Sequence, residues 1–559
     1  MKPRILRRYA SVLITAFVTA VAVREMASGA TSRFYDDDPI WTYRDTQDAS
    51  GVVPWEINLV VDLGLNLFGR PGDPALNVRA KNTNTVDEVP DSSWFTNRLG
   101  HRPLSVDEVA KGPNTTTGPA PGVWTVTSSK SDGVTPGFTI RDSNRQLWFL
   151  KFDAPEYRAM ATGTEVAVTK LFWALGYHVP ENYIAYLDRE QLAVGDGANV
   201  TLSNGRRREM RLDDIGTLLK RANPEPDGRY RVVASKALEG MPLGGFRFYG
   251  TRPDDPNDVV PHEHRRELRG YGVFAAWLNH VDAKAINSMD TLVRQNGRSF
   301  VRHNLLDFGS TLGSGALAPR EFWEGHEYLV EGAETGKQMM AFGFRFPAWH
   351  TMAYEESPAM GRLPADNVEF DPERWKPRVP NPAFIRARAD DKFWAATKLA
   401  AMTDDLLSAA VRAGDFGDAR TETFLVKALG ERRDAILRAY LNAANPVVAP
   451  ALDATGRLTF RNAAVDAKVA SPPQGYRAAW FAFDNATGAV RSIGESSAGA
   501  SPVAAPAGLP SGPGTMIRVE LAAVGGPNSS WERPVRLHFR QREGRWQLVG
   551  LEQMPDPES

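Results

Sequence analysis

The chain has 559 residues, enough for roughly two to four domains with substantial cores. Its hydrophobic content of 42% and charged content of 24% are those of an ordinary globular protein. The formal net charge of −1 gives no electrostatic footprint for binding nucleic acid. Because the chain has no cysteine, disulfides, thiolate metal sites, cysteine nucleophiles and bacterial lipidation are excluded.

The first 30 residues have the pattern of a secretory signal peptide. Four basic residues precede an apolar run over residues 9–23, and small residues at 27–30 offer a cleavage site. The apolar run is short for a membrane span. We therefore expect cleavage near Ala30, a periplasmic or secreted protein, and no stable membrane span after cleavage. An uncleaved amino-terminal anchor is the alternative.

Residues 31–122 are expected to form an extension that packs on the core rather than a separate domain. Within it the stretch 55–68 is amphipathic, and residues 111–122 are a loop by composition. The next loop, 128–137, combines two glycines with several hydroxyl groups and a lysine, which could donate hydrogen bonds to phosphates. Gly133 is the candidate phosphate contact there, and a plain surface turn is an equal alternative.

A lysine and a glutamate are predicted to face the same core. Residues 147–152 form an apolar strand, and a period of two puts Lys151 on its inward face. A lysine is costly to bury there unless it is paired. Glu165 lies on the apolar face of a predicted helix over 164–175, so the two side chains can form an ion pair. Glu156 is a rival partner, but it lies close to the end of the strand.

The most informative feature is a predicted hairpin with polar residues at its open end. Two strand-like runs between residues 291 and 303 are joined by Asn296-Gly297, a pair in which both residues accept positive φ. Counting back from this turn puts Asn287 opposite the residue before Asp307. Their oxygen atoms then lie side by side, in an arrangement that suits Mg²⁺ bound to phosphate. The pattern predicts a phosphotransfer site.

The motifs around this hairpin resemble those of protein kinases. The run 280–287, His-Val-Asp-Ala-Lys-Ala-Ile-Asn, is similar to the kinase loop H-R-D-L-K-x-x-N, and residues 307–309 are D-F-G without change. The order and the hairpin spacing look like those of atypical kinases of the CotH, HipA-like and secreted types. Valine stands at 281, where many eukaryotic kinases have arginine, which indicates that control by activation-loop phosphate is absent.

This resemblance implies roles for the polar residues of the hairpin region. Asp282 would orient or deprotonate the acceptor hydroxyl, and Lys284 would balance charge on the transferred phosphoryl group. Asn287 and Asp307 would hold Mg²⁺ or Mn²⁺. These four residues are the expected catalytic and metal-binding groups of the chain.

The nucleotide itself would be held by segments upstream of the hairpin. By the same resemblance, Lys151 and Glu165 would position the α- and β-phosphates of ATP or another nucleotide. Residues 230–240 are predicted to be a strand followed by a glycine-containing connection, where adenine would stack on apolar residues and bond to the backbone of residues 237–239. Glu239 is the last contact of that segment, and its placement rests on the order of elements alone.

The resemblance also implies an α+β, bilobal protein-kinase-like fold, with a small lobe over 123–240 and a large lobe over 241–445. The segment 315–390 would replace the usual A-P-E region and bind the acceptor. His262-Glu-His264 is interpreted as a solvated cap rather than as metal ligands. Helices of the large lobe are predicted at 265–278, 393–412 and 421–441.

The last part of the chain, residues 446–559, has a different character. Short strand-like runs alternate with turns, which predicts a small β-sandwich or a similar β-rich domain. Residues 497–514 are rich in proline, alanine, glycine and serine and are predicted to be a loop. The predicted strands are 457–460, 476–483, 516–521, 535–539 and 546–550.

We therefore expect an exported atypical kinase that transfers a phosphoryl group from a magnesium–nucleotide complex to an unknown hydroxyl of a protein or small molecule. Two alternatives stay open: a catalytically inactive kinase-fold scaffold of the cell envelope, and a nucleotidyl transferase on the same fold. Export leaves the donor open, since ATP is scarce outside the cytoplasm. Retention of five polar residues favours the enzyme, because a scaffold does not need them all: Lys151, Glu165, Asp282, Asn287 and Asp307.

Overall fold

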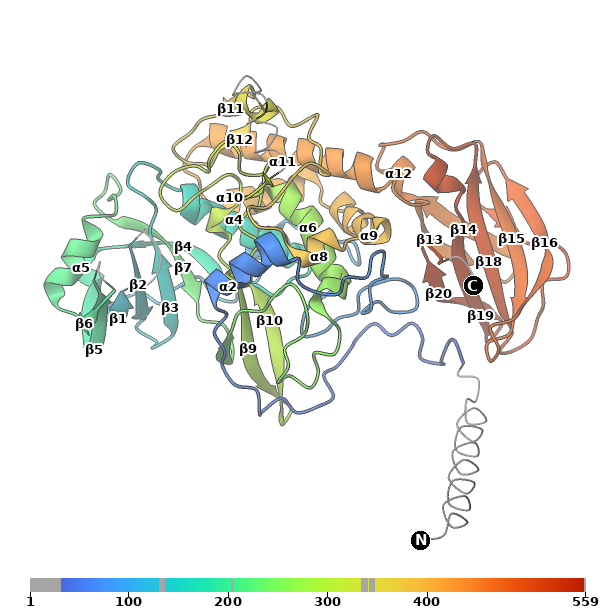
Figure 1. Cartoon of the computed structure of the whole chain (residues 1–559), viewed down its shortest axis with the longest axis horizontal. Helices are drawn as coiled ribbons and strands as arrows, with labels where there is room; N and C mark the ends of the chain where they lie inside the picture. The colour runs from blue at the N-terminus through green and yellow to red at the C-terminus, as the bar shows by residue number, and fades with distance from the viewer. Residues whose placement is uncertain (1–31, 130–135, 203–204, 333–339, 341–346, 557–559) are drawn as a thin grey trace, which may run out of the picture.

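The computed structural model describes the chain apart from residues 1–31, 130–135, 203–204, 333–339, 341–346 and 557–559. A seven-stranded sheet lies at one end, a mostly helical part with a three-stranded sheet lies in the middle, and a β-rich part lies at the other end (Figure 1). The fold is mixed α+β, as the sequence predicts. The expected signal peptide and Gly133 lie outside the described residues. Within the described ranges, no helix is long and apolar enough to cross a bilayer.

The seven-stranded sheet has the order β4-β7-β3-β2-β1-β5-β6. All its neighbouring strands are antiparallel except β1 and β5. A helix, α4 (Met160–Leu175), follows β3 and is almost wholly buried. The strands and the remaining helix are β1 (Trp124–Ser129), β2 (Gly137–Arg141), β3 (Leu147–Lys151), β4 (Asn182–Leu187), β5 (Leu192–Thr201), β6 (Arg207–Glu209), β7 (Tyr230–Lys236) and α5 (Leu212–Leu219).

The predicted hairpin is confirmed, including its register. Strand β9 (Ser288–Gln295) pairs with β10 (Arg298–Leu305) so that Gln295 faces Arg298, and Asn296 and Gly297 both have positive φ. At the open end, the Leu306 amide donates to the Asn287 carbonyl at 3.1 Å. A third strand, β8 (Met241–Gly244), completes this sheet.

The central part is built on α6 (Arg266–Leu278), which leads directly into loop 279–287. The helix predicted over 393–412 is wrong in one respect, because the structure has two helices there. The first helix ends at Ala400, and Thr403 caps the second by accepting a hydrogen bond from the Leu406 amide. The other elements are α8 (Pro382–Ile385), α9 (Ala389–Ala400), α10 (Asp404–Ala413), α11 (Ala419–Tyr440), β11 (Tyr354–Glu355) and β12 (Leu363–Pro364).

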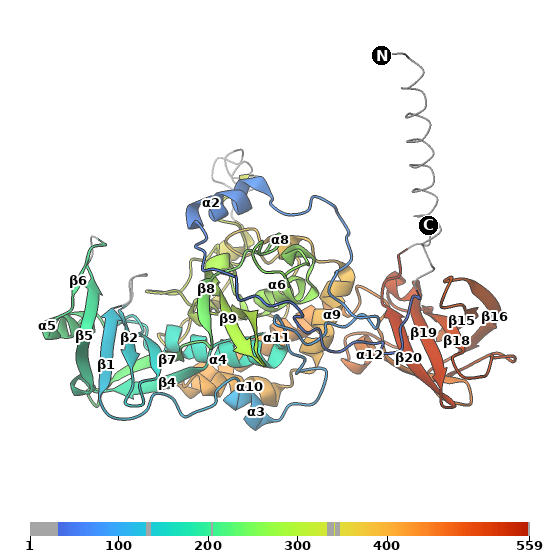
Figure 2. The same ribbon diagram turned by 90° about the horizontal axis from the view of Figure 1, so that it is seen from below.

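The amino-terminal extension packs on the central part through aromatic side chains. Trp94 stacks on His303 with ring centroids 3.5 Å apart, and the Thr96 amide donates to the Gly176 carbonyl. Its helix α2 (Leu59–Gly64) behaves differently, because it leaves most of its apolar side chains in solvent. Figure 2 shows α2 standing at the rim of the central part. The extension also contains a π-helix (Leu65–Gly69) and α3 (Val106–Lys111).

The interpretation of the two neighbouring histidines as a solvated cap is wrong. His262 and His264 are buried, and the carboxylates of Asp258 and Asp73 accept a hydrogen bond from the Nε2 atom of each ring. His262 Nε2 lies 2.7 Å from Asp258, and His264 Nε2 lies 2.9 Å from Asp73. These acids cover the histidines and satisfy their nitrogens, so the segment is a structural joint between the extension and α6.

The β-rich part contains two packed sheets, with orders β13-β14-β17 and β16-β15-β18-β19-β20. The Phe460 and Tyr476 rings meet between them at 4.7 Å. All five predicted strands form. The predicted loop at 497–514 is wrong at its start, because β16 extends to Ala498 and β17 lies within it. The strands are β13 (Val447–Leu452), β14 (Arg457–Asn462), β15 (Gly475–Phe483), β16 (Val490–Ala498), β17 (Val503–Ala504), β18 (Met516–Val524), β19 (Val535–Arg542) and β20 (Arg545–Glu552), with a short α12 (Ala463–Asp466).

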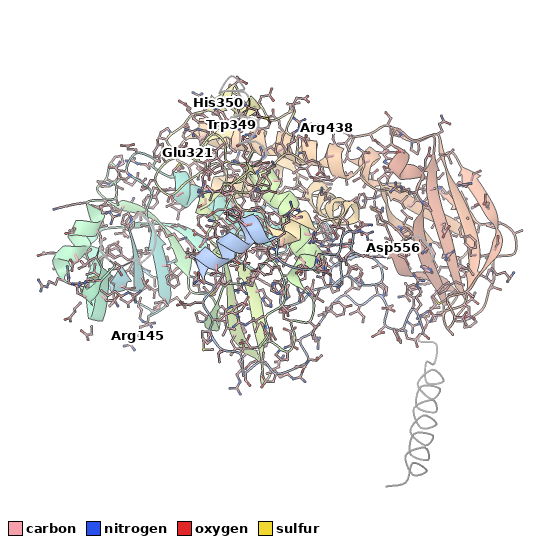
Figure 3. The ribbon with its side chains drawn as sticks, in the orientation of Figure 1. Arg145, Glu321, Trp349, His350, Arg438 and Asp556 are labelled. Carbon is pink, nitrogen blue, oxygen red and sulfur yellow. The ribbon has the colours of Figure 1, made fainter. Side chains whose placement is uncertain are left out.

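The β-rich part contacts the rest of the chain at several places, of which two lie near the ends of the described chain. Phe34 from the extension enters its core beside Phe483, with ring centroids 6.0 Å apart. Near the end of the chain, Asp556 lies on the side that faces the helices (Figure 3) and its carboxylate is 3.6 Å from Arg388. The extension therefore contacts both the central part and the β-rich part.

One histidine of this part is buried without a polar partner. The ring of His538 lies 4.8 Å from those of Phe34 and Phe483, and neither of its nitrogens has a hydrogen-bond partner among the described residues. Burial, assisted by three nearby arginines, lowers the pKa of His538 to about 3. His538 therefore becomes protonated near pH 6.5 in the unfolded chain but only near pH 3 in the folded chain.

We expect His538→Phe to make the protein less sensitive to acid. In the wild type this site should remove up to about 1.4 kcal/mol of stability for each pH unit below 6.5, because only the unfolded state binds the proton. Melting temperatures measured from pH 7 to pH 4 should therefore diverge, with the variant losing less. The exposed His101→Phe serves as the control and should follow the wild type. Parallel wild-type and His538→Phe curves would contradict this assignment.

Candidate active site

The expected ion pair between the strand lysine and the helix glutamate is present. Lys151, the last residue of β3, lies 3.6 Å from the Glu165 carboxylate of α4. Asn182 of β4 donates to the other Glu165 oxygen at 3.1 Å and so fixes that side chain. Burial alone would lower the pKa of Lys151, but Glu165 and Asp307 outweigh it and raise that pKa above its ordinary value. Lys151 is therefore protonated, and the two carboxylates fix the position of its ammonium group.

Glu165 also connects α4 to the Asp-Phe-Gly tripeptide. Its two oxygens accept the backbone N–H groups of Phe308 at 3.1 Å and Gly309 at 2.8 Å. The Phe308 ring is buried and stacks on Phe172 of α4 at 4.8 Å. A Cβ atom at Gly309 would lie 3.1 Å from the Glu165 carboxylate and 3.2 Å from the Ala161 carbonyl oxygen, so any larger residue here would have to push these neighbours away.

Asp307 lies between this group and the hairpin. Its carboxylate accepts a hydrogen bond from the Lys151 ammonium at 2.7 Å, and 44% of its side chain is exposed. Its backbone has a φ of 63°, which is uncommon outside glycine and most accessible to asparagine and aspartate. This turn begins the short 3₁₀ helix η5 (Phe308–Ser310) and leaves the carboxylate at the protein surface.

Loop 279–287 holds a second polar group. The Lys284 ammonium lies 2.6 Å from the Asp282 carboxylate, and Arg320 lies 3.9 Å from it. The Asn287 amide donates to the Asp282 carbonyl at 2.7 Å and to its carboxylate at 3.1 Å. Burial would raise the pKa of Asp282, but Lys284 and Arg320 outweigh it, so that pKa lies below its ordinary value.

His280 supports this loop from inside. It is fully buried, and Thr311 and its Nδ1 form a hydrogen bond of 2.9 Å. Burial lowers the pKa of His280 to about 4, so the ring is neutral at physiological pH. A neutral ring here packs against Phe308 and adds no charge beside the Asp282 carboxylate.

Among the described residues, the others predicted from the sequence do not contact the residues around Asp282 and Asp307. The Glu239 side chain is 67% exposed and forms an ion pair with Arg302 at 2.8 Å. The Ala237 amide donates to the Leu147 carbonyl of β3, so the backbone there closes onto the sheet. Glu156 is exposed, and the helix partner of Lys151 is Glu165. Gly133 is outside the described residues.

Sequence reasoning missed two residues that contact the site. Asn182 orients Glu165, and its only sequence signal is its position at the start of a strand that neighbours β7. Arg320 lies in the segment predicted to bind the acceptor, and its guanidinium also donates to the Ser314 carbonyl at 2.9 Å. Neither residue belongs to a spaced motif.

Together these contacts place three carboxylates, the Asn287 carboxamide and two ammonium groups around the open end of the hairpin. Such a set can bind a polyanion and orient a hydroxyl group. Comparison of the chain with protein-family models, with curated proteins and with solved structures finds no match. The function must therefore be argued from this geometry.

Proposed function

We propose that the protein is an exported atypical kinase, which transfers a phosphoryl group from a metal–nucleotide complex to a hydroxyl group. The observation that carries the proposal is the Lys151 contact with both Glu165 and Asp307, at the open end of the hairpin where Asn287 holds Asp282. Two of these residues come from the seven-stranded sheet unit and three from the central part. A bilobal kinase-like arrangement explains why the two parts meet at these residues.

The chemistry that these residues can perform follows from their charges. Lys151 presents an ammonium ion to phosphate oxygens, and Glu165 keeps it in place. Asp282 is an ionised carboxylate held by Asn287, so it can accept a hydrogen bond from an acceptor hydroxyl and orient its oxygen. As the new oxygen–phosphorus bond forms and the bond to the leaving phosphate breaks, the hydroxyl proton passes to this carboxylate.

A divalent cation fits the donor set of the site. The Asn287 amide nitrogen is committed to Asp282, which leaves its oxygen as the ligand atom, and Asp307 supplies an exposed carboxylate. One carboxylate and one carboxamide suit Mg²⁺ or Mn²⁺, which takes its other ligands from phosphate and water. When bound, the ion would neutralise charge on the phosphates.

The first test is a thermal-shift titration of the mature protein with ATP and other nucleotides, with and without Mg²⁺ or Mn²⁺. We expect a metal-dependent rise in melting temperature for at least one nucleotide. A ligand at 100 times its Kd adds about 2.7 kcal/mol to the free energy of unfolding when it binds only the folded state. Asp307→Ala should abolish the metal-dependent part of this rise.

The control for this experiment is Asp405→Ala, which removes an exposed carboxylate on α10 and should keep the full response. If no nucleotide with either metal shifts the wild-type protein, the kinase proposal fails and a non-catalytic scaffold is the remaining reading. Transfer of the nucleotide moiety, detected as a mass increase larger than one phosphoryl group, would instead identify a nucleotidyl transferase.

A further inference from the structure

A cavity of about 170 Å³ lies against the loop that carries Asp282 and Lys284. One wall is α2 of the amino-terminal extension, a second is the loop itself, and a third is the segment 379–382 before α8. Most of its lining is apolar, and the side chains that matter most here are Leu59, Leu63, Phe248, Ala285, Ile286 and Pro382.

The polar groups of the lining are mostly engaged within the protein. Asp62 accepts hydrogen bonds from Asn66 at 3.1 Å and from Tyr249 at 3.4 Å. Asn381 caps α8 through its carbonyl oxygen and donates to the Ala283 carbonyl. A ligand in the cavity therefore meets a mostly apolar surface with two charged residues, Asp62 and Lys284, and Lys284 leads to Asp282.

The size of the cavity limits what it can hold. An apolar cavity of roughly 150 Å³ stays dry and binds benzene in other proteins, so this one suits a single aromatic ring or a short branched alkyl group. Ala283 and Lys284, both in its wall, directly follow Asp282 in the chain. The Lys284 ammonium group lies 2.6 Å from the Asp282 carboxylate, so a hydroxyl group on a short arm of the bound ring can approach that carboxylate along the Lys284 side chain.

The geometry points to this cavity as the acceptor site, and to an acceptor that joins a hydroxyl group to an aromatic ring or a compact alkyl group. This inference rests on the proposed kinase function. In the step that it implies, the hydroxyl oxygen forms a bond to the transferred phosphorus while the bond to the leaving nucleotide oxygen breaks. The hydroxyl proton passes to Asp282, and the product is a phosphate monoester and the nucleoside diphosphate.

The cavity also changes where the acceptor is expected. The aromatic part of segment 315–390, with Glu321, Trp349 and His350, lies at one edge of the central part, whereas α2 crosses its face (Figure 3). Of the described residues of that segment, those at 379–382 line the cavity. The amino-terminal extension therefore supplies the second half of the acceptor site.

The test uses benzyl alcohol, which carries a ring and a primary hydroxyl group, and glycerol, which carries hydroxyl groups without a ring. Ligand-observed NMR on the mature protein should show saturable binding of benzyl alcohol and none of glycerol. Leu63→Asp places a carboxylate in the wall and should weaken benzyl alcohol binding by about tenfold or more, since apolar surface no longer faces the ring. Leu63→Trp fills the same space with an apolar ring and should weaken binding comparably.

Val60→Asp is the matched control, because Val60 lies on the same helix with 80% of its side chain exposed and should leave binding unchanged. With ATP and Mg²⁺ added, ³¹P NMR should show benzyl phosphate formed by the wild type and by Val60→Asp, and at least about tenfold less by Leu63→Asp.

The outcomes separate the inference from the proposed function. A nucleotide-dependent thermal shift without benzyl alcohol binding, or binding that Leu63→Asp and Leu63→Trp leave intact, overturns the cavity as the acceptor site and leaves the kinase proposal standing. Benzyl alcohol binding without any nucleotide response overturns both, because a cavity cannot be an acceptor site in a protein that binds no donor.

Discussion

Asp282→Asn should reduce the phosphotransfer rate by a factor on the order of 10²–10⁴, the usual contribution of a positioned acid–base group. The substitution keeps the shape of the side chain, so Asn287 and Lys284 retain a nearby oxygen, but it removes the negative charge that orients the acceptor hydroxyl and receives its proton. Nucleotide-dependent stabilisation should persist, because Lys151 and Asp307 are untouched. Release of nucleoside diphosphate and the thermal shift, measured on the same preparation, separate these two effects.

Asp405→Asn, on the exposed side of α10, is the control for the loss of one negative charge and should keep the wild-type rate. The pH profile gives a second check. Burial would raise the pKa of Asp282, but Lys284 and Arg320 lower it by more. The carboxylate therefore stays ionised at pH values below the ordinary pKa of an aspartate. We expect no acidic limb from Asp282 between pH 5 and 8. An apparent pKa near 6 that disappears in Asp282→Asn would contradict that assignment.

The hairpin and the pair Lys151–Glu165 could be predicted because local rules determine them. Asn296-Gly297 determines the turn, the turn determines the register, and the register brings Asn287 next to the residue before Asp307. The period of the helix likewise puts Glu165 on a buried face. The inward face predicted for the strand is wrong, because Trp148 and Leu150 are buried whereas Phe149, on the side of Lys151, is 43% exposed. These rules act within a single element and need no knowledge of the rest of the fold.

Contacts between distant segments could not be predicted in this way. Arg320 approaches Asp282 from the far side of an irregular segment. His262 is buried because Asp258 and the extension cover it, although its local sequence is polar. The amphipathic pattern of α2 predicts a helix, but it cannot show that Leu63 lines a cavity while Val60 faces solvent. In each case the outcome depends on which other segment covers the residue.

The largest effect on stability is expected at Arg266, the first residue of α6. Its guanidinium is buried and lies 2.9 Å from Asp87, 3.1 Å from Asp390 and 3.0 Å from Asp391. Burial would lower the pKa of Arg266, but the three carboxylates outweigh it and raise that pKa. Arg266→Met should cost about 3–5 kcal/mol, because it removes the cation that three buried carboxylates share and leaves each of them with one arginine. Chemical denaturation with tryptophan fluorescence measures the loss.

Arg420→Met is the matched control, because it breaks an ion pair with Glu355 in which 80% of the arginine side chain is exposed. It should cost no more than about 1 kcal/mol. The loss of free energy of unfolding in Arg266→Met should shrink as pH falls from 7 to 4, since protonation of Asp87, Asp390 and Asp391 removes their charge. In the wild type Arg266 keeps the pKa of Asp87 low despite burial, so the stabilisation that this carboxylate adds is fully present above the pKa of an unfolded aspartate.

A loss of stability below 1 kcal/mol in Arg266→Met, or one that is independent of pH, would mean that the cluster repacks around the smaller side chain. The joint between the extension and α6 would then be held by apolar contacts rather than by these charges.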